Sequence, residues 1–192
     1  LVNHFNLHEL HSYVWAYYDE YKQLGIEVED NIKLVNATNP NIETIRNSIV
    51  PTQLCQVKYN TAYGTDFGVF EIGRVAKGLK SDNRVDEHKM LAITLFSKTK
   101  SVEKLYFELR DMLATFTDNI KHKSLEFAPK AQAHSYEHPR NLNAVICDGT
   151  EIGTIGIVHP LVSKKIDKKA SIVFAEIDVK VLKMLFMLKN IK

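Results

Sequence analysis

Apolar residues recur along this chain with two periods, and neighbouring segments differ in which period they follow. Between residues 101 and 116 the spacing of three and four predicts a helix with one buried stripe, and Ser101 is a suitable cap for it. Residues 66–77 and 87–98 read instead as two strands joined by a loop. Both faces of 87–98 are apolar, which predicts a central strand covered on both sides.

The remaining segments also alternate between short helices and strands. Asp148-Gly149 is a strong signal for a two-residue hairpin, and Asp178 is a suitable cap for a final helix. We expect short helices at 19–24, 48–59 and 160–166, and strands at 13–17, 32–35, 124–127, 142–147, 151–158 and 172–177. Strands joined by hairpins, with helices inserted between them, predict an α+β fold with a mostly antiparallel sheet flanked by helices, in one domain over residues 1–192.

Composition narrows the class of protein only slightly. Lysine and arginine number 25 against 23 acidic residues, and this balance gives no argument for nucleic-acid binding by charge alone. Cys55 and Cys147 stand in no metal-ligand spacing, so we expect reduced thiols in a cytoplasmic protein. No apolar run reaches the roughly 18 residues of a membrane helix, so no membrane partner is expected. Because the chain opens with Leu1, we expect a fragment of a longer protein.

The sequence lacks the common motifs of enzyme active sites. There is no glycine-rich phosphate loop, no HExxH and no paired CxxC. His4, His8 and His11 fall at helical spacing, but no carboxylate or cysteine completes a metal site, and surface histidines are the simpler interpretation. We therefore expect no catalytic, cofactor-binding or metal-binding residues in this chain.

A basic cluster near the C-terminus is a candidate RNA contact. It consists of Lys164, Lys165, Lys168 and Lys169. Lysines of this kind bind phosphates, but Asp167 interrupts the cluster and no aromatic residue is interleaved for base stacking. A solvated helix face is the competing interpretation.

An aromatic segment near the N-terminus is a candidate subunit interface. It contains Tyr13, Trp15, Tyr17 and Tyr18. Tyrosine and tryptophan are enriched where proteins meet, but they also fill cores, and both interpretations stay open at this point.

Seven short segments, taken in order, resemble the β subunit of bacterial phenylalanyl-tRNA synthetase. They read NATNP at 36–40, IRNSIVP at 45–51, YN at 59–60, FEIGRV at 70–75, HP at 138–139, GTIGIVHP at 153–160 and FAEID at 174–178. The family's Gly-Arg after His-Pro is replaced here by Arg140-Asn141, and the segment through Tyr21 matches poorly.

The resemblance implies both a fold and a role. The implied fold is the catalytic-like core of class II synthetases, an antiparallel sheet with flanking helices. In that family the β module is a degenerate copy of the α catalytic domain and pairs with the α subunit. The resulting (αβ)2 enzyme uses ATP and Mg2+ to attach phenylalanine to tRNA(Phe), while no cofactor is expected in this fragment. The alternative is a stand-alone class II synthetase-like paralogue with its own small-molecule or RNA-binding role.

The distribution of arginines argues against chemistry in this module. Class II synthetases, which the chain resembles, clamp ATP phosphates with arginines, and losing one such donor costs roughly 3 kcal/mol of transition-state stabilisation. This chain has five arginines and none follows Arg140. Arg74 is expected on a strand, but pairing with Glu71 or another carboxylate is the favoured use for it. The last strand and helix offer instead Glu176, Asp178, Lys180 and Lys183. We expect the module to be catalytically inactive and to dock the catalytic α subunit.

Overall fold

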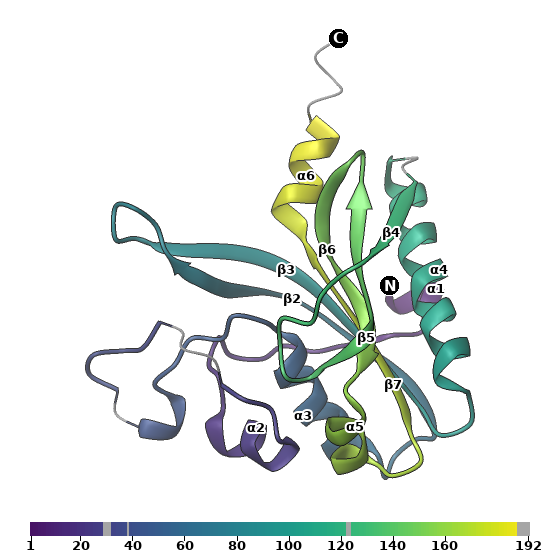
Figure 1. The fold of residues 1–192 in the computed structure, drawn as a ribbon, viewed down its shortest axis with the longest axis horizontal. Helices are drawn as coiled ribbons and strands as arrows, with labels where there is room; N and C mark the ends of the chain where they lie inside the picture. Colours follow the sequence, from purple (N-terminus) through teal and green to yellow (C-terminus); the bar gives the residue numbers. More distant parts are fainter. Residues whose placement is uncertain (29–31, 38, 122–123, 188–192) are drawn as a thin grey trace.

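A seven-stranded mixed sheet, in the order β1-β2-β3-β7-β6-β5-β4, forms the centre of the protein (Figure 1). The structure is a computed structural model that describes residues 1–28, 32–37, 39–121 and 124–187. The strands are β1 (His8–Glu9), β2 (Asp66–Leu79), β3 (Val85–Ser97), β4 (Leu125–Pro129), β5 (Glu137–Cys147), β6 (Thr150–Val158) and β7 (Ser171–Asp178). Among these strands, β1 and β2 run parallel and every other neighbouring pair is antiparallel. The prediction of a mostly antiparallel α+β fold is confirmed.

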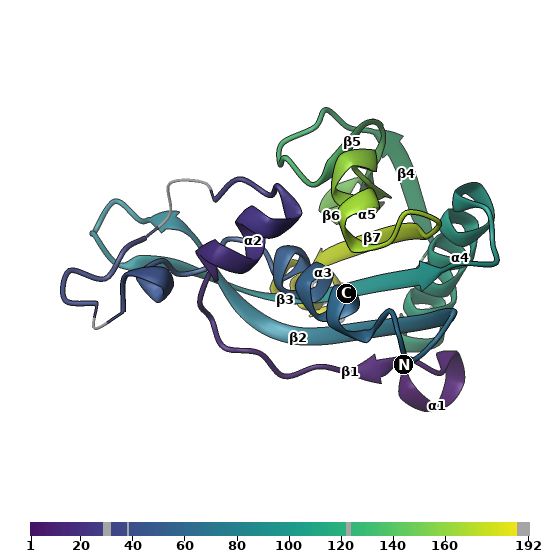
Figure 2. The same cartoon turned by 90° about the horizontal axis from the view of Figure 1, so that it is seen from below.

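Helices cover both faces of this sheet (Figure 2). One face carries α1 (Val2–Phe5), α4 (Val102–Lys121) and α6 (Val179–Met187), and the other carries α2 (Tyr18–Leu24), α3 (Val50–Asn60) and α5 (Pro160–Ile166). A short 3-10 helix, η1 (Pro40–Ile42), follows the turn signal at Asn39, whose side chain accepts a hydrogen bond from Asn41 N. The sheet is therefore the middle of three layers.

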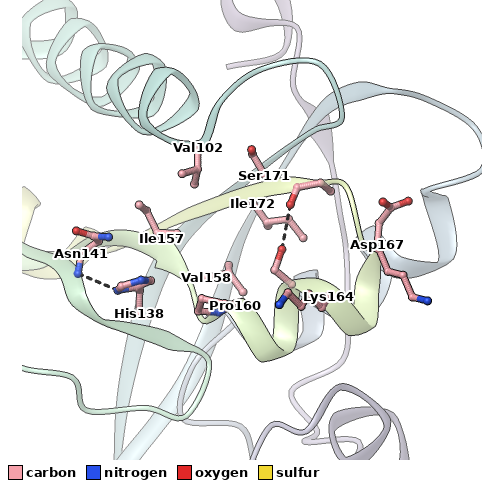
Figure 3. A pocket seen from close by; sticks show the side chains of 13 residues that line it. Val102, His138, Asn141, Ile157, Val158, Pro160, Lys164, Asp167, Ser171 and Ile172 are labelled. Carbon is pink, nitrogen blue, oxygen red and sulfur yellow. Dashed lines mark hydrogen bonds between the residues drawn. The ribbon is translucent and has the colours of Figure 1, made fainter.

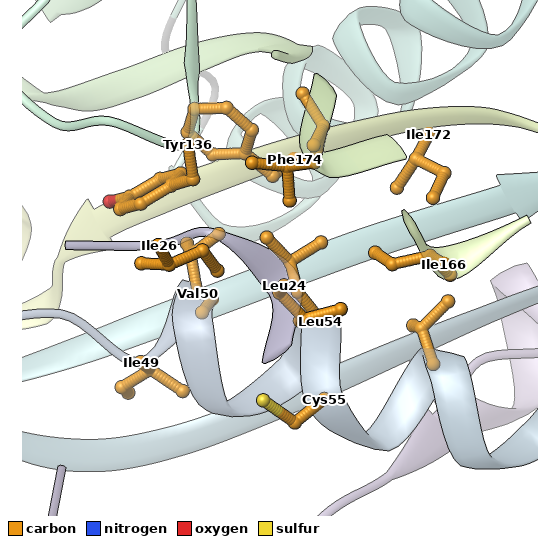
Figure 4. Close-up of a cluster of buried hydrophobic side chains, with 14 of the residues drawn as sticks. Leu24, Ile26, Ile49, Val50, Leu54, Cys55, Tyr136, Ile166, Ile172 and Phe174 are labelled. Carbon is orange, nitrogen blue, oxygen red and sulfur yellow. The ribbon is translucent and has the colours of Figure 1, made fainter. Parts of the chain in front are cut away.

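The alternation of β7 separates two hydrophobic cores. Val173 and Ala175 face the core under α4 and α6, while Ile172 and Phe174 face the core around α3 (Figure 4). All four are at most 1% exposed. A strand buried on both faces reads as a continuous apolar run, which is the pattern that β3 also shows from Met90 onward. The prediction of a central position for β3 is confirmed, since it lies between β2 and β7.

Turn and capping residues act largely as the sequence predicts. Asp148 and Gly149 have φ values of 50° and 73°, as a tight hairpin between β5 and β6 requires. The Asp178 carboxylate accepts from Lys180 N at 2.8 Å and so caps α6. Gly25 ends α2 in the left-handed region, at φ 72°. These local signals fix where each element begins and ends.

Two strand predictions in the N-terminal part are wrong. Residues 13–17 are not a strand, because this segment makes only an isolated bridge between Trp15 and Ile45. Ala16 N donates to Thr44 O and Arg46 N donates to Val14 O, and no longer ladder forms. In residues 32–35, the bridge between Lys33 and Thr44 is the sole pairing within the described part of the chain. The alternating aromatic residues at 13–17 therefore reflect an extended backbone that is not part of the sheet.

A buried ion pair holds this N-terminal segment against β2. Arg46 Nη2 lies 2.7 Å from Glu71 Oε1, and the two side chains are 2% and 3% exposed. Ser12 joins the pair, accepting from Arg46 Nη1 and donating to Glu71 Oε2, both at 2.6 Å. The guanidinium also donates to Arg74 O. Because the polar groups of Arg46, Glu71 and Ser12 all have hydrogen-bond partners, burying them is not destabilising. The cluster therefore holds the N-terminal segment in one position against β2.

Candidate functional site

The exposed end of the α3 face holds a cavity of about 290 Å³, here called the sheet cavity. It lies over the middle strands, and β3 lines it with His88 and Met90. From β7, Phe174, Glu176 and Asp178 point to the same side because alternate residues of a strand share a face.

The carboxylates of the sheet cavity are occupied by the fold itself. Glu176 accepts from Ile49 N at 2.7 Å, directly before α3. Asp178 caps α6 and also lies 2.5 Å from His88 Nδ1. Glu137 accepts from Ala133 N and His134 N at 2.7 and 2.8 Å. These acids therefore stabilise helix starts and turns, and they leave a negative lining unsuited to phosphates.

Among the described residues, no arginine lines the sheet cavity. Arg46 is buried in its pair with Glu71, and Arg74 pairs with Glu87 at 3.3 Å on an exposed part of the hairpin. Arg74 thus has a carboxylate partner as predicted, but it is Glu87 and not Glu71. The cavity's lysines are engaged too, Lys77 with Asn47 O and Lys130 with Glu151. A guanidinium clamp is missing from the described lining.

The aromatic segment divides between core and surface. Tyr13 is 75% exposed, while Trp15, Tyr17 and Tyr18 are half-buried. Tyr17 packs against the core around α3, and Tyr18 Oη lies 2.8 Å from Thr44 Oγ1. Of these four predicted interface residues, Tyr13 alone has a largely exposed side chain.

The edge of the sheet at β1 carries a groove that the sequence does not predict. This edge groove has a volume of about 400 Å³ and is lined by His8 and Leu10 beside β1 and by Tyr63, Phe67 and Val69 from the turn and strand that follow α3. Tyr63 is 87% exposed. No sequence signal marks it, because an exposed tyrosine in a turn looks the same as a buried one.

The lysine cluster lies on α5 and the turn behind it, and all four side chains are exposed. The helix turns Val162 and Ile166 inward, which leaves Lys164 and Lys165 on its outer side. A second groove, of about 290 Å³, runs along the same helix (Figure 3). The structure brings Lys164 and Lys168 to the wall of this α5 groove.

The three N-terminal histidines do not meet on one helix. His4 lies in α1, His8 in β1, and His11 beyond both, where it contacts Glu9. In the described residues, no group of three or more His, Cys, Asp and Glu side chains could hold a metal ion. Both cysteines are buried as free thiols, and burial raises the pKa of Cys55 to about 12. The helical spacing of the histidines thus has no structural counterpart.

The fold and cavity define an α+β domain with a mostly antiparallel sheet and an acidic, arginine-free cavity over it. No described helix is long and apolar enough to span a membrane. The chain belongs to the family described as the phenylalanyl-tRNA synthetase beta chain CLM domain, because the sequence profile of that family matches residues 1–179.

Known relatives are distant in sequence and much longer. Phenylalanine–tRNA ligase beta subunits are similar to this chain in Leptospira borgpetersenii (21% identity over 176 residues, 89% of the chain), Listeria monocytogenes (28% over 162, 79% of the chain) and Aquifex aeolicus (25% over 161, 83% of the chain). The chain spans 20–22% of the length of these relatives.

Proposed function

We propose that this chain is the non-catalytic core of a phenylalanine–tRNA ligase β subunit, which docks the catalytic α subunit in an (αβ)2 enzyme. The whole enzyme attaches phenylalanine to tRNA(Phe) in the cytoplasm, using ATP and Mg2+, while this segment holds neither. Relatives named as beta subunits of that ligase support the assignment, since a β subunit has a partner. A central, mostly antiparallel sheet with one parallel edge pairing supports a class II synthetase-like architecture.

The observation that carries the non-catalytic part is the lining of the sheet cavity. Activation of an amino acid with ATP needs cations placed where charge develops on the phosphate. Here Glu176 and Asp178 are the charged β7 side chains of the cavity, and both are committed to the starts of α3 and α6. Replacing these two carboxylates by cations that bind phosphate would therefore remove the hydrogen bonds at the starts of two helices.

The surface that fits the α subunit is the edge of the sheet formed by residues 8–13 and the edge groove. β1 pairs only with β2, so its other edge is open among the described residues. Tyr13 and Tyr63 are exposed, and Tyr63 lines the edge groove; exposed tyrosines are typical anchors of protein interfaces. Trp15 bridges to Ile45, Tyr17 packs against the core around α3, and Tyr18 lies beside Thr44, so these three hold the segment in place.

Co-purification with the α subunit tests the docking surface. Tyr13→Ser combined with Tyr63→Ser is expected to weaken binding of α at least about tenfold, because interface anchors contribute about 2 kcal/mol or more. Phe107→Ser, which changes a 49% exposed aromatic on α4, is the matched control and should leave binding unchanged. Unchanged binding in the tyrosine variant, with loss in the control, would place the interface on the α4 face and contradict this assignment.

The second candidate is a stand-alone class II synthetase-like paralogue with its own small-molecule or RNA-binding role. The volume of the sheet cavity is the one observation that supports this candidate. Such a protein would bind its ligand without an α subunit.

A further inference from the structure

Positive charge in this protein is concentrated in one short stretch. Residues 164–169 contain four lysines and one aspartate, a net charge of +3, whereas the whole chain has +2. The rest of the chain therefore has a net charge of −1. A balanced total conceals a local cationic surface, and it is the local potential that attracts an anionic partner.

The exposed lysines of this cluster are not neutralised by the acid among them, and the Lys165 ammonium lies beside Gly25 at the end of α2. Asp167, the acid among them, accepts from Lys169 N at 2.8 Å and pairs with Lys98 Nζ at 3.1 Å. The Lys169 N–H, and after it Lys98, holds the pKa of Asp167 below its usual range, so this carboxylate stays ionised and engaged. In the described part of the chain, no carboxylate forms an ion pair with the ammonium groups of Lys164, Lys165, Lys168 and Lys169.

The α5 groove adds neutral hydrogen-bond donors beside these cations (Figure 3). His138 Nδ1 accepts from Arg140 N at 3.1 Å and from Asn141 N at 3.2 Å. The neutral ring therefore carries its proton on Nε2, as a donor at the groove wall. Asn141 lines the same wall, and Ile157 and Ile172 form part of an apolar lining. Cations, N–H donors and a small apolar floor suit a phosphate attached to a sugar.

The composition of this surface favours RNA over an acidic protein. Protein interfaces are depleted in lysine and rich in Tyr, Trp and Phe, and none of those aromatics is among the described residues that line the α5 groove. Phosphate backbones are bound mainly by lysine and arginine, without base specificity. We propose that the lysine cluster and the α5 groove together bind the sugar–phosphate backbone of RNA. The inference rests on the proposed function only for the identity of that RNA, which would be the ligase's tRNA.

Fluorescence anisotropy with a labelled tRNA transcript, measured over a series of salt concentrations, tests the proposal on the 192-residue chain. The variant K164Q/K165Q/K168Q/K169Q removes four charges without burying or exposing apolar groups. Affinity at low salt is expected to fall at least tenfold, and the slope of log K against log salt should decrease by about 1 for each lysine that contacts phosphate.

The matched control is K80Q/K89Q/K180Q/K183Q, which removes the same charge from exposed lysines on the β2–β3 hairpin and α6. It should keep affinity within about twofold, since it lies away from the cluster. Equal losses in both variants would show a nonspecific charge effect and overturn the proposal. So would competition by poly-glutamate as effective as competition by RNA, which would indicate an acidic protein partner. Retained α co-purification alongside either result would leave the proposed function standing.

Discussion

The buried ion pair of Arg46 and Glu71 stabilises the fold only while both side chains are present. Each side chain is at most 3% exposed, and Ser12 satisfies the remaining atoms. Truncating one member of a buried pair leaves the other charge unpaired, which costs about 3–5 kcal/mol.

Urea unfolding of Arg46→Met should therefore show a loss of about 3–5 kcal/mol in the free energy of unfolding. The exposed pair of Arg74 with Glu87 provides the comparison, because surface pairs contribute about 0–1 kcal/mol. Equal losses in Arg46→Met and Arg74→Met would mean that the network around Glu71 does not hold the N-terminal segment.

Asp66, at the start of β2, links stability to pH at the residue scale. Hydrogen bonds from Ser97 and then Thr99 hold its pKa below the ordinary value. A carboxyl with a lowered folded pKa stabilises the fold above its unfolded pKa of about 3.9, and this contribution disappears as the pH falls through the folded pKa.

Asp66→Asn should accordingly be less stable than the parent protein at pH 7, with a gap that narrows as the pH drops below about 4. Thermal unfolding at a series of pH values measures this gap. A constant difference from pH 7 to pH 3 would show that ionisation of Asp66 does not contribute. The exposed Glu126→Gln, on β4, serves as a control with the same type of change.

At the scale of elements, stability depends on the close contact between β6 and β7 at Gly153. A Cβ at Gly153 would lie 2.1 Å from Glu176 O and 2.8 Å from Ile177 Cα, both backbone atoms of β7. Neither can move without disturbing the ladder between β6 and β7. Gly153→Ala should lower the free energy of unfolding by at least about 1–3 kcal/mol, the usual cost of overpacking.

Gly64→Ala is the matched control, since its Cβ would meet only Phe67 Cδ1 at an ordinary 3.4 Å. Denaturant unfolding of the two variants compares them directly, and the control is expected within about 0.5 kcal/mol of the parent. If both substitutions were tolerated equally, the tight contact between β6 and β7 would not be a feature of the folded protein.

Elements with strong local signals could be predicted from sequence, and those decided by tertiary contacts could not. The stripe of α4 and the Asp148-Gly149 hairpin lie within contiguous stretches, so their patterns are complete in the sequence. The parallel pairing of β1 with β2 joins residues 61 positions apart, as between His8 and Val69, and two residues carry no period. Tyr13 to Tyr17 alternates for a different reason, because its extended backbone lies beside residues 44–46 without forming a ladder.

The candidate surfaces also divide into those that are local in sequence and those that tertiary contacts assemble. The lysine cluster could be found from sequence because its members are adjacent, whereas the sheet cavity gathers His88, Glu176 and Asp178 from separate strands. Their grouping depends on the pairing of β3 with β7, in which Met90 lies opposite Asp178. The edge groove depends likewise on where α3 ends relative to β1.

For the whole molecule, the acidic groups over the middle of the sheet hold helix starts and turns. The proposed partner surface and the sheet cavity are separate, since Tyr63 lines the groove beside β1 while Glu176 and Asp178 lie over the middle strands. Loss of phosphate binding would then leave docking intact.

Phenylalanine-dependent exchange of pyrophosphate into ATP tests this separation most directly. The purified chain alone is expected to give no exchange above a protein-free blank, and addition of the α subunit should produce exchange that rises with the amount of complex. Exchange by the chain alone, proportional to its concentration, would show that this chain activates phenylalanine by itself and would contradict the account.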